Sequence, residues 1–213
     1  MSPPDLKHDV WGWRKYQHTA CFKSGGDSCP ARDGRHLYGV AFDTAPCVHP
    51  HPSSLAMALL TYAATVDTTQ RDGLSVGDVL SDGSDPHRDH LLADDEVLTR
   101  VTLPPRAEGE RAAYFRSISR FEAEWPLVEA VCRVVREEAG AVTSCAVAIG
   151  GVAPVPLRLG RAEEILTGST LDDDTISAAA RRATEGASPL PETGYKVQLI
   201  EATVLEVLER VRS

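Results

Sequence analysis

The stretch that decides the fold is residues 127–152, LVEAVCRVVREEAGAVTSCAVAIGGV. It contains two valine-rich apolar runs, residues 127–135 and 141–152, each of a length typical of a buried strand. A further strand is predicted just upstream, at residues 112–119. These runs predict the strands of an antiparallel sheet.

Beyond Pro156 the apolar spacing becomes helical, at residues 161–166, 170–184 and 194–212. Gly168 and Gly186 follow the first two segments, where glycine commonly ends a helix. Strands followed by helices indicate an α+β class. We therefore expect an antiparallel sheet with helices packed on one face, spanning residues 95–213.

Upstream of this sheet, residues 96–103 alternate apolar and polar side chains and stop at Pro104 and Pro105, which predicts a half-buried strand. Residues 76–95 are rich in Asp and Gly, a composition that favours a long surface connection. The sequence therefore predicts one domain at residues 1–94 and a second at residues 95–213.

Within residues 1–94, the first 50 carry Gly, Pro and Cys punctuation and predict an irregular segment with one short strand at residues 38–42. A helix is predicted after Pro52, where Ser53 or Ser54 can act as the N-cap. Its apolar residues recur at helical spacing: Leu55, Met57, Ala58, Leu59, Leu60 and Ala63.

Composition excludes several partners. The formal net charge of −9 argues against binding nucleic acid, which requires a basic surface. Apolar runs stay shorter than the ~20 residues of a membrane span, and the N-terminus does not resemble a signal peptide, so we expect a cytoplasmic protein. Five cysteines in such a chain indicate reduced thiols or metal ligands and not a disulfide framework.

Five phrases then occur in a fixed order along the chain: CFKSGGDSC at residues 21–29, Cys47 with HPS at 51–53, DEVLT at 95–99, WPLV at 125–128 and AIGGVAPVP at 148–156. Together they resemble the FAD-binding medium subunit of xanthine dehydrogenase, carbon monoxide dehydrogenase and hydroxybenzoyl-CoA reductase type enzymes. The resemblance covers roughly residues 10–210 and corresponds to the C-terminal two thirds of that subunit. Residues 1–94 would then be the remnant of a flavin-binding α/β domain, with a Cys-containing loop.

The resemblance implies a subunit of a molybdenum hydroxylase complex that relays electrons from iron-sulfur clusters through FAD to an acceptor. Its partners would be a molybdopterin-binding large subunit and a two-iron two-sulfur small subunit. No residue is assigned a catalytic role, because the cofactor supplies the chemistry of flavin electron transfer.

The family places two Gly-rich phosphate-binding loops upstream of the matched region, so the FAD site is expected to be incomplete. Gly25-Gly26 is more typical of a turn. The alternative functions are a docking or structural module that does not bind FAD and a truncated subunit.

Three positions correspond to flavin-binding positions of the family: Ser54, Leu98 and Arg116. Ser54 stands where the family has Asp and is expected to cap the helix. Arg116 replaces the family's common Lys, and a cation there would stabilise the anionic reduced flavin. The alternatives are a core strand residue for Leu98 and a solvated strand residue for Arg116.

The spacing of Cys21, Cys29 and Cys47 resembles part of the pattern by which some family members hold a four-iron four-sulfur cluster. No cysteine occurs near residues 10–14, where the fourth is expected, and His18 or His49 could complete the set. The alternative is that these cysteines are small packing residues.

Overall fold

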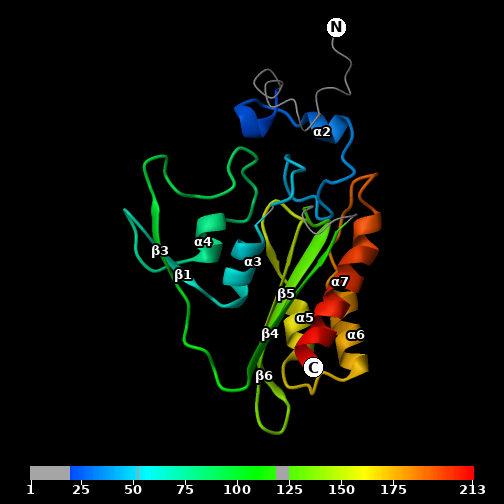
Figure 1. The fold of residues 1–213 in the computed structure, drawn as a ribbon. Helices are drawn as coiled ribbons and strands as arrows, with labels where there is room; N and C mark the ends of the chain where they lie inside the picture. The colour runs from blue at the N-terminus through cyan, green and yellow to red at the C-terminus, as the bar shows by residue number, and fades with distance from the viewer. Residues whose placement is uncertain (1–19, 52, 119–124) are drawn as a thin grey trace.

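The computed structural model describes residues 20–51, 53–118 and 125–213. Within them the chain forms two antiparallel sheets, one of four strands and one of three, with α3 between them in Figure 1.

The four-stranded sheet has the order β4-β5-β6-β7. Its strands are β4 (Glu110–Ser117), β5 (Val128–Arg136), β6 (Val142–Gly150) and β7 (Leu157–Arg158). All three strand pairs are antiparallel. The three strands predicted at residues 112–119, 127–135 and 141–152 are confirmed over their described lengths, whereas the two residues of β7 are too few to show a periodicity.

Three helices cover one face of this sheet: α5 (Gly160–Leu166), α6 (Asp173–Arg182) and α7 (Tyr195–Arg212). Alternate residues of β5 point into the core beneath them, and Val128, Cys132 and Val134 are fully buried. Cys145 packs against the same core from β6. The α+β class, with an antiparallel sheet and helices packed on one face, is therefore confirmed.

The opposite face of the sheet is partly covered by α3 (Ser54–Thr61). Ser53 is its N-cap, and its side chain accepts a hydrogen bond of 3.0 Å from the Ala56 N–H. Met57 is completely buried between the helix and the sheet, against Val131 and Ala148. The predicted helix thus connects the first half of the chain to the sheet of the second half.

The three-stranded sheet has the order β2-β1-β3, with strands β1 (Thr65–Thr68), β2 (Leu74–Ser75) and β3 (Leu98–Thr102). Because β3 pairs with β1, this sheet joins residues from both sides of position 94. The division into residues 1–94 and 95–213 stays a prediction.

Two expectations for this region are wrong. The strand at residues 96–103 is not half-buried, because β3 lies at the edge of its sheet and all five of its residues are exposed. The expected connection at residues 76–95 begins instead with the helix α4 (Val76–Leu80), whose N-cap is Ser75. Helix α4 forms because Val79 and Leu80 can bury their side chains against β1.

The strand predicted at residues 38–42 is also wrong. This segment is a loop with one isolated bridge, from Phe42 to Ser188. The N–H groups of Ala41 and Phe42 both donate to the Val152 carbonyl, at 2.7 and 3.0 Å, in place of a strand ladder. The apolar residues are buried as a strand's would be, which explains why the sequence pattern was misleading.

Candidate functional site

A buried carboxyl group, Glu129 of β5, lies at the centre of the candidate site. Its Oε2 accepts hydrogen bonds from Ser54 Oγ at 2.5 Å and from Tyr114 Oη at 2.9 Å. Its Oε1 is buried and has no hydrogen-bond partner among the described residues. Sequence reasoning missed this residue, although a single Glu inside the apolar run VEAVCRVV was a signal.

Glycine at position 150 makes room for this carboxyl group. A Cβ added there would lie 2.8 Å from Glu129 Oε1, closer than side chains normally approach. Gly150 ends β6, next to β5 in the sheet, and Glu129 is its partner in the register. Three strands and the start of α3 therefore hold the site together.

Ser54 occupies this site because Ser53, and not Ser54, caps α3. The expected capping role of Ser54 is therefore wrong: its hydroxyl donates to Glu129 and does not accept from the helix backbone. A carboxylate at position 54 would face the Glu129 carboxylate, and like charges at that distance repel. Serine at position 54 therefore avoids a charge repulsion with Glu129 and donates a hydrogen bond to it instead.

Arg116 is the cross-strand partner of Glu129 and shares its face of the sheet with Tyr114. Burial raises the pKa of Tyr114, Glu129 contributes in the same direction, and Ser54 and Arg116 oppose the shift. The structure therefore brings Ser54 and Arg116 into one cluster with Tyr114 and Glu129. This cluster offers a cation and two hydroxyl groups around one carboxyl group.

Leu98 is not part of this cluster in the described part of the chain. It lies in β3, pairs with Thr68 of β1, and its side chain is 43% exposed. It is therefore not a core residue of its strand. It belongs to an exposed apolar set that also includes Val97, Val101 and Leu103.

The three cysteines of the predicted cluster are only partly brought together. Cys29 and Cys47 are buried, and a hydrogen bond between the two thiols lowers the pKa of Cys29 and raises that of Cys47. Cys21 is half-exposed and forms a backbone bridge with Ser28. Among the described residues no group of three or more His, Cys, Asp or Glu could hold a metal ion, and His18 lies outside these residues.

The Cys-containing loop packs on the loop at residues 85–92. Lys23 Nζ forms an ion pair with Asp89 at 2.8 Å, and His87 Nε2 lies 3.0 Å from the Gly26 carbonyl. Gly25 has φ +85° and ends the short 3-10 helix η2 (Phe22–Ser24). A Cβ at Gly26 would lie 2.2 Å from the Ala20 backbone, so the glycine pair forms a tight turn.

Residues 113–211 match the family described as the CO dehydrogenase flavoprotein C-terminal domain, which corresponds to most of the four-stranded sheet and its three helices. The chain is also 29% identical to the aldehyde oxidoreductase FAD-binding subunit PaoB of Escherichia coli, over 88% of this chain and 57% of that protein. It is 30% identical to the 6-hydroxypseudooxynicotine dehydrogenase complex subunit alpha of Paenarthrobacter nicotinovorans, over 55% of this chain and 42% of that protein.

Solved structures show the same fold. Quinoline 2-oxidoreductase from Pseudomonas putida 86 superposes with a TM-score of 0.65 and 22% identity, covering 85% of this chain and 60% of that chain. Carbon monoxide dehydrogenase from Hydrogenophaga pseudoflava gives a TM-score of 0.64 and 22% identity, over 73% and 55% of the two chains.

Residues 113–211 therefore match the CO dehydrogenase flavoprotein C-terminal domain family, and the chain is similar in sequence to an aldehyde oxidoreductase FAD-binding subunit. It spans about half the length of the curated relatives it matches. Across the described residues, no helix is both long and apolar enough to cross a membrane.

Proposed function

We propose that the chain is part of the flavin subunit of a cytoplasmic molybdenum hydroxylase complex. In this proposal it passes electrons from iron-sulfur clusters through FAD to an acceptor, and its partners are a molybdopterin-binding large subunit and a two-iron two-sulfur small subunit. The observation that carries the proposal is the polar cluster of Ser54, Tyr114, Arg116 and Glu129, which lies at the junction of α3 with a sheet of the CO dehydrogenase flavoprotein type.

The cluster fits the polar edge of a flavin ring. Arg116 supplies a positive charge and Tyr114 and Ser54 supply hydroxyl groups, while Glu129 fixes both hydroxyls in place. Bound FAD would supply the electron-transfer chemistry, and Arg116 would stabilise negative charge on the reduced ring. Leu98 is proposed as an apolar contact of the same ring, presented by β3 with its side chain partly exposed.

The pyrophosphate of FAD requires a different segment. Gly25 and Gly26 are accounted for by the turn in the Cys-containing loop, so they do not form a phosphate cradle. We assign only the ring side of the site to this chain. Riboflavin, which has the ring but no pyrophosphate, should then bind the chain about as well as FAD.

This assignment is tested by titrating the 213-residue chain with riboflavin and with FAD while following flavin fluorescence. Arg116→Ala should weaken both ligands about 10-fold, as expected for removing a charged contact. Arg181→Ala, at an exposed position of α6, is the matched control. Unchanged affinity in Arg116→Ala, or no flavin binding by the wild-type chain, would contradict the assignment.

A four-iron four-sulfur cluster held by Cys21, Cys29 and Cys47 with a further ligand stays a prediction. The adjacent thiols of Cys29 and Cys47 favour it, whereas no group of three metal ligands is assembled among the described residues. Reconstitution with iron and sulfide, followed by iron analysis and visible absorbance, tests it. Cys29→Ser should lose the iron, whereas Cys145→Ser, in β6, should retain it.

The alternative function is a docking module that does not bind FAD. The glycine turn at residues 25–26 favours it, because that turn was the nearest candidate for a phosphate site. A folded chain that leaves the fluorescence of both flavins unchanged would select this alternative.

A further inference from the structure

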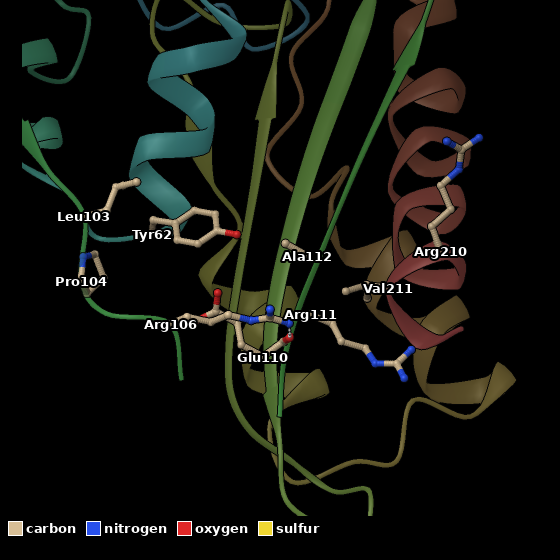
Figure 2. Close-up of a pocket in the computed structure, with 9 residues that line it drawn as sticks. All are labelled: Tyr62, Leu103, Pro104, Arg106, Glu110, Arg111, Ala112, Arg210 and Val211. Carbon is tan, nitrogen blue, oxygen red and sulfur yellow. Dashed lines mark hydrogen bonds between the residues drawn. The ribbon is translucent and has the colours of Figure 1, made fainter. Parts of the chain in front are cut away.

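A groove of about 700 Å³ runs along the first half of β4. Figure 2 shows its two sides: Tyr62, the C-cap of α3, with Leu103 and Pro104 on one, and Arg111 with α7 on the other. The groove lies near the start of β4, whereas Arg116 lies near the end of the same strand. We call it the β4 groove, and it goes beyond the flavin site proposed above.

The β4 groove follows a free sheet edge. Among the described residues, β4 is the terminal strand of the four-stranded sheet and pairs with β5 alone. The Glu110 N–H donates to the Ala107 carbonyl at 3.3 Å, and the Glu110 carbonyl accepts from Arg106 Nη2 at 3.3 Å, so both groups point toward the β3 to β4 connection. Strand alternation directs the N–H and C=O groups of Ala112 and Tyr114 to the same edge. An unpaired edge of this kind can accept another strand.

The two sides of the β4 groove differ in chemistry. Phe115 and Ser117 contact the core and α7, so Arg111, four and six residues from them in the same strand, lies on the α7 side. Arg210 also lies on this side, with its guanidinium 4.5 Å from the centroid of the Phe115 ring. The other side carries the apolar surface of Tyr62, Leu103 and Pro104.

The charge of the β4 groove is opposite to that of the whole chain. Arg106, Arg111 and Arg210 line it, against one acidic residue, Glu110. Glu110 is already neutralised by Arg133 Nη2 at 2.6 Å, and Arg210 Nε forms an ion pair with Glu206 at 2.7 Å, so Arg106 and Arg111 contribute most of the positive charge. The chain as a whole carries a formal charge of −9, so this groove is a local positive site on an acidic protein.

We propose that the β4 groove binds an extended acidic segment of a partner protein, which adds to β4 as a further strand. Alternate side chains of an added strand point to opposite faces. The segment should therefore alternate acidic residues, toward Arg111 and Arg210, with apolar residues, toward Tyr62 and Leu103. A second copy of this chain fits poorly, because pairing two β4 strands would bring the arginines of both copies together.

The test uses a fluorescein-labelled heptapeptide of alternating Glu and Val, titrated with the 213-residue chain by fluorescence anisotropy. Controls are the alternating Lys and Val peptide and a Glu and Val peptide of the same composition with the two residue types in separate blocks. Binding of the first peptide alone is the expected result. Arg111→Glu should weaken it about 10-fold or more, whereas Arg181→Glu, on α6, should not.

Strand addition itself is tested by hydrogen exchange. The peptide should slow exchange of the Ala112 and Tyr114 amides and leave that of Ala113, which faces β5, unchanged. Ala112→Pro should abolish binding without lowering the Tm, because the proline removes an outward N–H. If that variant unfolds, the exchange pattern of the wild-type chain and the peptide affinity of Arg111→Glu still test the proposal.

Four results would overturn the proposal. Equal binding of the block peptide would mean that the groove attracts any anion. A dimer detected by sedimentation and displaced by the peptide would assign the edge to a second copy. No binding of the alternating peptide, or equal binding to Arg111→Glu, would leave the groove without the proposed partner. None of these results depends on flavin binding, so the two proposals fail separately.

Discussion

The four-stranded and three-stranded sheets bury their strands to different degrees. In the larger sheet, β5 lies between α7 on one face and α3 on the other, and Val128, Ala130 and Cys132 are fully buried. In the smaller sheet, β3 exposes all five residues, including Leu98 and Val101. Alternation of apolar and polar residues therefore predicts a strand but does not by itself predict burial, which depends on what packs against the strand.

The two sheets should differ most in how much stability is lost when an apolar side chain is truncated. Leu208→Ala on α7 removes a fully buried side chain from the larger core and should lower the free energy of unfolding by about 2–5 kcal/mol. Urea denaturation measures this change. A loss below about 1 kcal/mol would mean that the helices are loosely packed on the sheet.

Glu129→Ala should have the next largest effect. It leaves the hydroxyl groups of Ser54 and Tyr114 without their acceptor and should cost about 1–3 kcal/mol. Glu129→Gln keeps an acceptor and should cost less. Chemical denaturation of both variants gives the comparison, with Glu137→Gln at an exposed position as the control. Equal losses of stability in Glu129→Ala and Glu129→Gln would mean that the carboxylate charge, and not its hydrogen bonds, accounts for the contribution of Glu129.

The larger sheet should gain stability at alkaline pH. Burial lowers the pKa of Lys196 from 10.5 to about 8, and its Nζ donates to the Gly151 carbonyl at 2.8 Å. Between pH 8 and 10.5 the unfolded chain binds more protons than the folded chain, so stability rises with pH across this window. Lys196→Met should flatten that rise in urea midpoints measured at several pH values. A rise that persists in the variant would exclude Lys196 as its source.

The smaller sheet should lose stability at acid pH. Hydrogen bonds from Arg71, Thr68 and the Ala93 N–H lower the pKa of Glu96 from 4.5 to about 2. Because the folded pKa is the lower one, the contribution is present above pH 4.5 and is lost as pH falls toward 2. The protection factors of the β1 amides, which are corrected for the pH dependence of intrinsic exchange, should decrease over that range. Glu96→Gln should make these protection factors insensitive to pH, and an unchanged acid response would contradict the assignment.

Leu98→Ala should have the smallest effect on stability, within about 0.5 kcal/mol, because the side chain is already exposed. Urea denaturation of this variant beside Leu208→Ala tests the contrast between the two sheets directly. A loss of several kcal/mol would show that β3 is buried in solution, against a second molecule or another segment.

Much of the larger sheet could be predicted from the sequence. The apolar runs around Val131 and Val147 each form a strand at the expected place, and Gly168 follows the end of α5 as predicted. Local rules predict these elements: the spacing of apolar residues distinguishes a strand from a helix, and a glycine commonly follows the end of a helix. The sequence wrongly predicts a strand at residues 38–42, because this loop carries apolar residues such as Val40 and Ala41, which are buried as strand residues usually are.

The candidate site could be predicted only in part. Ser54 and Arg116 were chosen by resemblance, but their common neighbour Glu129 was not, because a cluster that joins residues 54, 114, 116 and 129 has no signature in local spacing. Leu98 was expected beside them and lies in the other sheet. Whether it contacts the same flavin stays a prediction.

The sequence by itself determined the α+β class, the strands β4, β5 and β6 with the three helices that follow them, and the likeness to flavin subunits, because hydrophobic periodicity and short phrases are local properties. The tertiary structure alone decided that β3 pairs with β1, that Ser54 donates to Glu129 and that the edge of β4 lies beside three arginines. Each of these depends on contacts between distant residues, and such contacts are set by how the elements pack together and not by the order of neighbouring residues.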